Sequence, residues 1–571
     1  MKRLEGLTYI GLLAVLVLGA YIRLIPILEA GTDWLADLDP YRNLRAVNEV
    51  ISNGRMPLFD NLSAAPNGTY ATYSTSQGYY MLSSALTLIS GSNSSVVLSF
   101  SPVIYEVALL LVVYVLGSEL ANSRWTGLFA AFFVAIPRGW AMISLIGTCP
   151  LAENLGAVVF PLVLLLFWKC TVQKRKSFLL FSGLLLGISL LIHPVTYFYL
   201  VVTIFVYVVL MCIVERRVRI LVIGLEVLVI SFFAVLIQFF SIRDFGYLSS
   251  FTHGALWLAS LRPVYPVVDF YVVFYEVGGL VLFLSLMALI LVFLDRKWNY
   301  LILASCSIVM LGIIALSLVV PLRPFLANVP FGAFIILSHR VMMPYLPLVL
   351  SLLGGIFVTE YLLPCVGTDN KLKCRISFKK AVAVFILIVV FIAISIPSIQ
   401  SSLEYSANYK WASWAKQYAP LFKWVKDNTN ASDIFVLNEI SLGEAVKTSA
   451  ERPTVFTLSY QDLVTPDLVK RMWLQSSVFI RGYDDNIAQR LLYDFNVSYV
   501  VVVRNQYNLD IVNKNYVPPA PDDSFSLYLK WMDDKNYLER VYSDTNVGFY
   551  VYSVYRELLF KGEINLPTVK P

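Results

Sequence analysis

Residues 33–45 read DWLADLDPYRNLR, and they directly follow an apolar segment, residues 7–28, which reads LTYIGLLAVLVLGAYIRLIPIL. The apolar segment has the length that crosses a hydrocarbon core of about 30 Å. Three carboxylates within seven residues therefore emerge where a predicted membrane helix ends. Charges at that place are costly unless they face water, each other or a cation. The stretch is thus both a membrane boundary and a candidate functional site.

The composition extends this interpretation to most of the chain. Of its 571 residues, 58% are hydrophobic and 14% are charged, whereas a soluble globular protein carries about 25% charged residues. Apolar runs of roughly 20 residues recur and predict about eleven membrane-spanning helices. The expected spans are 7–28, 101–118, 124–142, 153–171, 177–192, 196–214, 218–240, 267–293, 299–320, 338–361 and 380–398. The sequence therefore predicts a polytopic α-helical membrane protein, and its small net charge of +6 gives no reason to expect nucleic acid as a partner.

Positive charges predict which side of the membrane each loop faces. Lys and Arg gather in alternate short loops, for example at residues 174–176 and 371–380, and the positive-inside bias places such loops in the cytoplasm. We therefore expect an integral, multi-pass protein of the cell membrane, with its N terminus cytoplasmic. The predicted membrane domain covers residues 1–398 and includes a large first extracytoplasmic loop, residues 29–100. Residues 399–571 are expected to form a soluble extracytoplasmic domain.

The C-terminal part has the pattern of an α/β domain. It is long enough to bury a core of its own. Residues 411–428 carry aromatic and apolar side chains at helical spacing, and residues 433–437 and 497–503 are short apolar runs typical of buried strands.

Asp39 is the carboxylate of the opening stretch whose surroundings are most specific. Pro40 disfavours helical geometry at Asp39, and a carboxylate placed in this way can coordinate Mg²⁺ or Mn²⁺. It can equally act as a general base toward an acceptor. The same residue also suits the N-cap of a helix that begins at Pro40. The site role and the capping role are compatible.

Further charged residues lie at the predicted outer ends of spans. Glu153 follows the loop sequence GTCPLA and either caps a helix or belongs to a site shared with Asp39. His193 precedes Pro194 at such an end and either caps a helix or serves a site. Arg340 begins a long apolar span on the side where the positive-inside bias disfavours a cation. Its guanidinium suits bidentate contact with a lipid phosphate, and the alternative is an arginine that snorkels to the interface.

The order of these parts resembles the GT-C superfamily of membrane glycosyltransferases and, within it, the catalytic subunit of oligosaccharyltransferases, above all the archaeal ones. Residues 37–45, DLDPYRNLR, are similar to that family's first-loop signature, an Asp-Pro followed by an aromatic residue and then Asn/His-x-Arg. Residues 147–160 lie at the place of its second acidic motif. Residues 423–429, KWVKDNT, resemble the helix that opens its soluble domain.

The resemblance implies a GT-C fold and an enzyme, a hexosyl or oligosaccharyl transferase. Such an enzyme takes a sugar or glycan from a polyprenyl (dolichyl) phosphate-type donor. It transfers this group to a protein, glycan or lipid acceptor on the extracytoplasmic face of the bilayer.

The resemblance also implies roles for particular residues. Asp39 matches the family's catalytic Asp, and Glu153 stands at the place of the second acidic motif, so both are expected to be catalytic and to hold a divalent cation, Mg²⁺ or Mn²⁺. Arg340 stands where the family has an arginine near the outer end of a late span, and it is expected to bind the donor phosphate. The other residues expected to bind substrate are His339, Arg323, Asp37 and Arg45.

Two departures from the family pattern keep other functions open. Thr148, Cys149 and Pro150 stand where more acidic residues are expected, and the WWDYG motif that reads an asparagine sequon is absent. The first alternative is an oligosaccharyltransferase paralogue that glycosylates protein Asn. The others are a non-catalytic structural subunit and a lipid transporter or flippase. A transporter is disfavoured because the centres of the predicted spans are largely free of charge, with Glu226 as the main exception.

Overall fold

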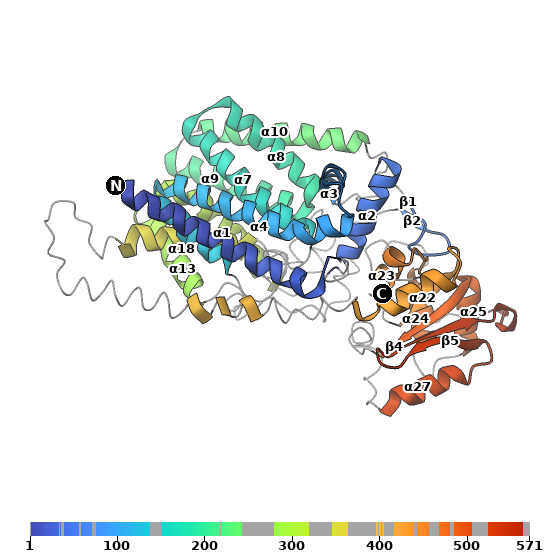
Figure 1. The fold of residues 1–571 in the computed structure, drawn as a ribbon. Coiled ribbons are helices and arrows are strands. Elements are labelled where there is room, and N and C mark those ends of the chain that lie inside the picture. Colours follow the sequence, from blue (N-terminus) through green and yellow to red (C-terminus); the bar gives the residue numbers. More distant parts are fainter. Residues whose placement is uncertain are drawn as a thin grey trace, which may run out of the picture. The chain divides into compact units, whose positions relative to one another are not determined.

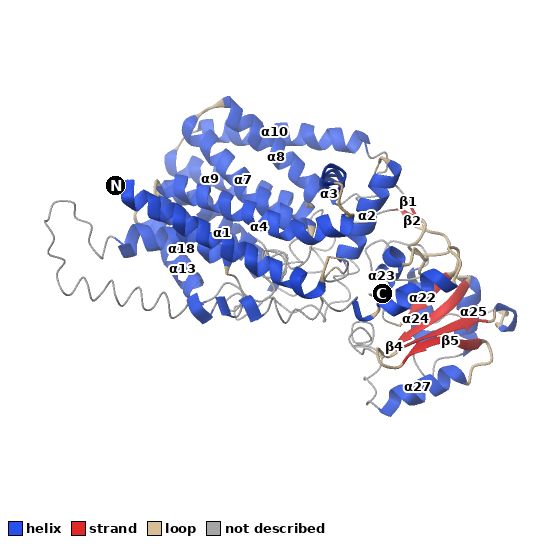
Figure 2. Cartoon of the chain, in the orientation of Figure 1, coloured by secondary structure: helices blue, strands red, loops and turns tan. Residues whose placement is uncertain are grey.

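The fold is that of a computed structural model, drawn in Figures 1 and 2. The residues that the structure describes are 2–32, 35, 39–55, 59–70, 76–136, 150–216, 218–241, 279–318, 345–363, 395–397, 399–400, 402–404, 416–438, 442–455, 468–479, 485–504 and 523–563. They form two compact units. The first contains the described residues of 1–33, 75–245 and 267–410, and the second contains those of 34–74 and 411–571.

The first unit is built from α-helices, because a chain that crosses a bilayer must satisfy its backbone hydrogen bonds internally. Its helices are α1 (Lys2–Ala30), α3 (Gln77–Ser90), α4 (Ser94–Ala121), α5 (Arg124–Ala135), α7 (Ala152–Gln173), α8 (Lys176–Ile192), α9 (Pro194–Glu215), α10 (Val218–Ser241), α13 (Gly279–Leu294), α14 (Leu301–Leu318) and α18 (Tyr345–Phe357). A π-helical turn, Val358–Leu362, follows α18.

Within the described residues, seven helices are long and apolar enough to cross a membrane. Three shorter apolar helices lie at Arg124–Ala135, Lys176–Ile192 and Val281–Leu294. The predicted polytopic helical architecture is therefore confirmed. The predicted number of spans is not, since residues 380–394 of the last one lie outside the described part of the chain.

A buried ion pair joins α1 to α4 inside the first unit. Arg23 Nη2 lies 2.8 Å from Glu106 Oε1, and both side chains are 0% exposed. Arg23 Nη1 also donates hydrogen bonds to the carbonyl oxygens of Gly19 (3.2 Å) and Ala135 (3.1 Å). Arg23 and Glu106 lie within the predicted spans 7–28 and 101–118, and the sequence pattern does not predict their pairing. Two charges that neutralise each other are tolerated at this depth, where either one alone is costly.

Close packing of α4 and α5 depends on a glycine. A Cβ added at Gly127 would lie 2.2 Å from both Ser118 Oγ and the Tyr114 carbonyl oxygen. We therefore expect Gly127→Ala to force the helices apart and to destabilise the protein by about 1–3 kcal/mol. Gly312→Ala is the matched control, since nothing lies within 4 Å of a Cβ at Gly312 in α14. Thermal unfolding of both variants in detergent checks the prediction, and equal midpoints would contradict it.

The second unit contains a four-stranded sheet in the order β3-β4-β6-β5. Its helices and strands are α2 (Asp39–Asn53), β1 (Phe59–Asp60), β2 (Thr69–Tyr70), α22 (Ala419–Asn428), β3 (Ile434–Leu437), α23 (Leu442–Ser449), α24 (Leu468–Phe479), α25 (Asp485–Asp494), β4 (Val497–Val503), α27 (Asp523–Asp533), β5 (Leu538–Asp544) and β6 (Phe549–Val554). Strands β3 and β4 are parallel, with Val436 opposite Val500, and β6 runs antiparallel to both β4 and β5. The C-terminal α/β domain and both predicted strands are confirmed.

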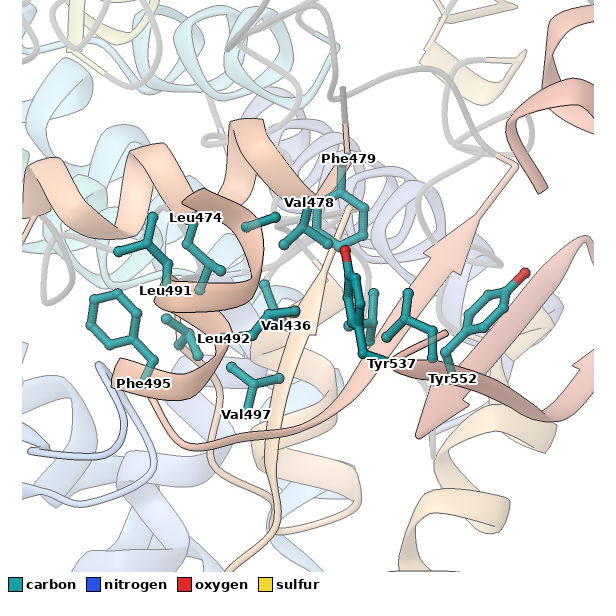
Figure 3. Close-up of a cluster of buried hydrophobic side chains, with 14 of the residues drawn as sticks. Val436, Leu474, Val478, Phe479, Leu491, Leu492, Phe495, Val497, Tyr537 and Tyr552 are labelled. Carbon is teal, nitrogen blue, oxygen red and sulfur yellow. The ribbon is translucent and has the colours of Figure 1, made fainter. Parts of the chain in front are cut away.

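The core of the second unit lies between this sheet and its helices (Figure 3). Leu474 and Val478 from α24 and Leu491 from α25 pack with Val436 of β3 and Val497 of β4. Burial of these apolar side chains stabilises the unit, each by about 1.5–3 kcal/mol when it is complete.

Residues 59–70 join this core from a distant part of the sequence. The Thr454 amide donates to the Leu62 carbonyl (2.9 Å), and the Ala65 amide donates to the Thr454 carbonyl (3.1 Å). Arg471, which is 1% exposed, donates to the carbonyls of Ala64 (2.9 Å) and Ala65 (2.8 Å). The sequence predicts residues 59–70 as part of the first extracytoplasmic loop of the membrane domain, whereas in the structure they belong to the same compact unit as the C-terminal sheet.

Candidate functional site

The structure describes the predicted site residues unevenly. Asp37, Arg323, His339 and Arg340 lie outside the described residues, and of Asp39 only the backbone is described, as the first residue of α2. Glu153 lies in the first unit and Asp39 in the second, so their predicted convergence stays a prediction. The remaining two residues, Glu153 and Arg45, have described side chains.

Arg45 lies in α2, where it is buried among carboxylates. Its Nε donates to Glu49 Oε1 at 3.0 Å, and its Nη2 pairs with Asp60 Oδ1. The Asp60 side chain is 0% exposed and that of Arg45 is 7% exposed. Contact between Arg45 and a substrate stays a prediction.

Glu153 lies in the first turn of α7, next to a histidine that the chain brings from the junction of α8 and α9. Glu153 Oε1 is 3.4 Å from His193 Nε2, and the two side chains are 13% and 9% exposed. Pro194 at the first position of α9 ends α8 at this point. His193 adopts extended backbone geometry between the helices, and its amide donates to the Ser189 carbonyl (2.8 Å). The imidazole is therefore held in place by both helix ends.

The second ring nitrogen of His193 contacts two hydroxyl groups. Nδ1 lies 3.1 Å from Thr196 Oγ1 and 3.0 Å from the Tyr345 hydroxyl oxygen. The two hydroxyls also hydrogen-bond to each other. We call Glu153, His193, Thr196 and Tyr345 the Glu153 cluster. It joins the starts of α7, α9 and α18.

A glycine allows the Glu153 cluster to close. A Cβ added at Gly156 would lie 2.4 Å from Thr196 Oγ1 and 3.4 Å from the Tyr345 hydroxyl oxygen. The Tyr345 ring also packs against Phe160, with a centroid distance of 5.0 Å. These contacts fix the phenol and, through it, the orientation of the His193 ring.

The Glu153 cluster has the chemistry of a proton acceptor. The carboxylate can take a proton from an acceptor group, and the imidazole beside it can share or relay that proton. The contacts of Nδ1 with the two hydroxyls, on the other side of the ring, orient Nε2 toward the carboxylate.

The described part of the chain does not by itself provide a site for a divalent cation. Among its residues, no group of three or more His, Cys, Asp or Glu side chains is placed to hold a metal ion. Glu153 and His193 supply one oxygen and one nitrogen donor, which is fewer than Mg²⁺, Mn²⁺ or Zn²⁺ requires. The other predicted ligand is Asp39, whose side chain is not described.

The sequence signals for these residues differ in strength. The sequence predicts Glu153 as a site residue. For His193 it leaves two interpretations open, a helix cap and a site residue. Thr196 and Tyr345 were missed, because a hydroxyl near the end of an apolar span has no distinctive pattern. The Pro that follows His193 was the only local sign that this side chain sits at a helix junction.

Comparison with known structures defines the class of fold. A crystal structure of the Archaeoglobus fulgidus oligosaccharyltransferase, tethered to an acceptor peptide with an NVT sequon, matches with a TM-score of 0.60 and 16% identity over 86% of this chain and 68% of that one. The archaeal oligosaccharyltransferase AglB from Archaeoglobus fulgidus, in complex with an inhibitory peptide and a dolichol-phosphate, matches with a TM-score of 0.57 and 17% identity over 86% of this chain and 69% of that one. ArnT from Cupriavidus metallidurans in the apo state gives 0.53 and 14% over 98% and 99%. The GT-C fold predicted from the sequence is thus confirmed.

The sequence itself gives a more particular match. Residues 27–278 match the family model described as oligosaccharyl transferase STT3, N-terminal. This family match confirms the resemblance to the catalytic subunit of oligosaccharyltransferases. The comparison with curated protein sequences gave no match. The family match covers residues 27–278. It includes the opening stretch that carries Asp39 and the helix that carries Glu153.

Proposed function

We propose that this chain is a membrane glycosyltransferase that moves a sugar or glycan from a polyprenyl phosphate-type lipid to an acceptor on the extracytoplasmic face. One observation carries the proposal. Glu153, at the start of an apolar helix, contacts His193 in a cluster tied to α18, within the part of the chain that matches the oligosaccharyl transferase STT3 model. A carboxylate at this place also suits the helix N-terminus, and its contact with a histidine adds the acid–base pair that proton transfer requires.

The donor lipid would bind through its phosphate. Arg340 is the first candidate for this contact. His339, which directly precedes it, and Arg323, which lies earlier in the chain, are further candidates. A guanidinium binds phosphate oxygens bidentately, and a positive charge here stabilises the negative charge that grows on the leaving group. Tyr345, five residues after Arg340, ties the start of α18 to the Glu153 cluster.

Transfer then requires removal of a proton from the acceptor. The acceptor oxygen or nitrogen attacks the anomeric carbon, the bond from that carbon to the phosphate oxygen breaks, and the lipid phosphate leaves with the electron pair. The acceptor proton passes to the carboxylate of Asp39 or Glu153, with His193 holding the Glu153 side chain in orientation. Asp37 would add negative charge beside Asp39. A Mg²⁺ or Mn²⁺ held by Asp39 and Glu153 would supply further positive charge to the donor phosphate.

The proposed topology agrees with this chemistry. Cytoplasmic basic loops would place the N terminus inside the cell and the second unit outside. Both Asp39 and Glu153 would then face the compartment in which lipid-linked sugars are presented by the outer leaflet.

A donor comparison tests the proposal. We would reconstitute the full chain in vesicles and supply dolichyl phosphate-linked hexoses in one arm and the corresponding nucleotide sugars in the other, each with a radiolabelled sugar. Membrane extracts provide the acceptors. We expect labelled product only from the lipid-linked donors. Transfer from nucleotide sugars, or no transfer from any lipid-linked donor, would contradict the proposal, and the second outcome would favour a non-catalytic structural subunit.

The second candidate is an oligosaccharyltransferase paralogue that glycosylates protein asparagine. The family match over residues 27–278 favours it, whereas the missing WWDYG motif disfavours it. A sequon peptide supplied with a lipid-linked oligosaccharide separates the two candidates. Formation of glycopeptide would establish the paralogue, and its absence alongside transfer to another acceptor would support the first proposal.

A further inference from the structure

A chain of polar side chains links α2 to α23 within the second unit. We call it the α2–α23 lock, and it consists of the buried Arg45, Asp60, Ser63, Lys447 and Glu444 and the partly exposed Glu49 and Thr448. The sequence does not predict it, because its members come from residues 45–63 and 444–448, which are almost 400 positions apart.

The lock begins on α2. Arg45 pairs with Glu49 one turn further along and with Asp60 beyond the end of the helix. Asp60 Oδ1 accepts the amide of Ser63 at 3.1 Å, and Asp60 Oδ2 accepts the Ser63 hydroxyl at 2.6 Å. Both Asp60 and Ser63 are buried, with 1% and 0% of their surfaces exposed.

The lock continues on α23. Lys447 Nζ donates to Ser63 Oγ at 2.7 Å and to Glu444 Oε1 at 2.7 Å, and the Lys447 side chain is 0% exposed. One residue on, the Thr448 hydroxyl lies 3.0 Å from the carbonyl oxygen of Tyr41 and 2.9 Å from that of Glu444, so its one proton is shared between α2 and the preceding turn of α23. Tyr41 is only two residues from Asp39, so α23 contacts the first turn of α2 directly.

Electrostatics favour the ionised form of the Asp60 carboxyl within the lock. Burial alone would raise the pKa of the Asp60 carboxyl, but the charges of Arg45 and Lys447 outweigh burial and lower that pKa below its ordinary value. A lowered pKa means that Asp60 stabilises the unit above the ordinary range near pH 4, and that this contribution is lost as the pH falls through the folded-state pKa.

We propose that Arg45, Lys447 and Thr448 are positioning residues, which hold α2 against α23 so that Asp39 at the helix start is fixed by the C-terminal unit. The inference rests on the proposed role of Asp39 and deepens it. A catalytic carboxylate must be held within about 0.5 Å of its productive place, and misplacement by about 1 Å costs roughly 100-fold in rate. In this role Arg45 acts through α2.

The alternative is that the lock serves stability alone. Buried ion pairs are poor stabilisers compared with apolar side chains of the same volume. The side chains of Asp60 and Lys447 are both 0% exposed. Their burial is therefore better explained if these charges fix the position of α2 against α23 than if they only add stability.

The test uses the full chain and the dolichyl phosphate hexose that gives transfer in the donor comparison. Thr448→Val removes the hydroxyl that contacts α2 but keeps the shape and charge of the site. We expect it to lower kcat about tenfold with little change in KM for the donor, and to speed hydrogen exchange in residues 41–53. Thr448→Ser should restore both. Ser477→Ala is the control, because the Ser477 hydroxyl donates only within α24, to the Leu474 carbonyl.

The outcomes separate this inference from the proposed function. If Asp39→Asn abolishes transfer while Thr448→Val changes neither kcat nor exchange in α2, the positioning role is wrong. If Thr448→Val speeds exchange in α2 and leaves kcat at the wild-type value, the lock serves structure only, and the inference is again wrong. If Asp39→Asn leaves transfer intact, the proposed function fails at Asp39 independently of the exchange result.

Discussion

Replacing Glu153 by Gln is expected to lower the rate of sugar transfer at least 100-fold while leaving the protein folded. Gln has nearly the same shape as Glu, but it carries no charge and cannot take the acceptor proton, and loss of a general base typically costs about 10²–10⁴-fold. His193 Nε2 would keep an oxygen partner in the amide, so the contact at 3.4 Å should survive. The measurement is the initial rate of transfer in vesicles, with thermal unfolding as the check on the fold.

The matched control is Glu119→Gln. Glu119 lies on α4, is 41% exposed in its side chain and pairs with Lys169 at 2.9 Å. An exposed pair of this kind contributes about 0–1 kcal/mol, so this variant should keep both the transfer rate and the fold. A Glu153→Gln enzyme as active as Glu119→Gln would exclude Glu153 from the chemistry.

Replacing Arg23 by Met is expected to destabilise the first unit by about 3–5 kcal/mol, the cost of leaving a buried charge without its partner. Glu106 would then lie among apolar helices with 0% of its side chain exposed and no cation beside it. The carbonyl of Ala135 would also lose a donor. The measurement is the midpoint of unfolding in detergent, where the variant should unfold at much lower temperature or denaturant concentration than the wild type.

The double variant Arg23→Met with Glu106→Gln removes both charges and separates electrostatics from packing. It should recover most of the lost stability, because an uncharged pair of similar volume is often as stable as the ion pair. Lys169→Met, which breaks the exposed pair with Glu119, should cost less than about 1 kcal/mol. If the double variant were as unstable as Arg23→Met, packing and not charge would explain the loss.

The features that the sequence predicted well are those with a local pattern. A run of about 20 apolar residues can satisfy its own backbone only as a helix, so the spans near residues 7–28 and 153–171 coincide with α1 and α7. The apolar run at 497–503 has the length and composition of a buried strand, and it forms β4.

The features that escaped prediction depend on contacts between distant residues. Nothing near Leu62 indicates that its carbonyl accepts the amide of Thr454. Likewise, the sequence shows that Arg23 lies within an apolar run, but it does not show that Glu106 neutralises its charge. Such pairings are set by packing of the whole fold and leave no periodicity in the sequence.

The candidate site was predicted in part for the same reason. Glu153 stands out because a carboxylate at the start of an apolar helix is rare, but only the folded chain brings Tyr345 to His193. The resemblance to a known family supplied the roles of Asp39 and Arg340, which composition and spacing alone do not give. These roles stay predictions that substitution can test.

The most direct test of lipid-linked sugar transfer is to identify the lipid that the reaction releases. Wild-type protein in vesicles would be given a dolichyl phosphate-linked hexose together with the acceptor found in the donor comparison, and the lipid products would be followed by ³¹P NMR. We expect free dolichyl phosphate to appear in step with the glycosylated acceptor for the wild type, and to be reduced at least 100-fold for Glu153→Gln. Transfer without released dolichyl phosphate, or equal release by the two proteins, would contradict the proposed function.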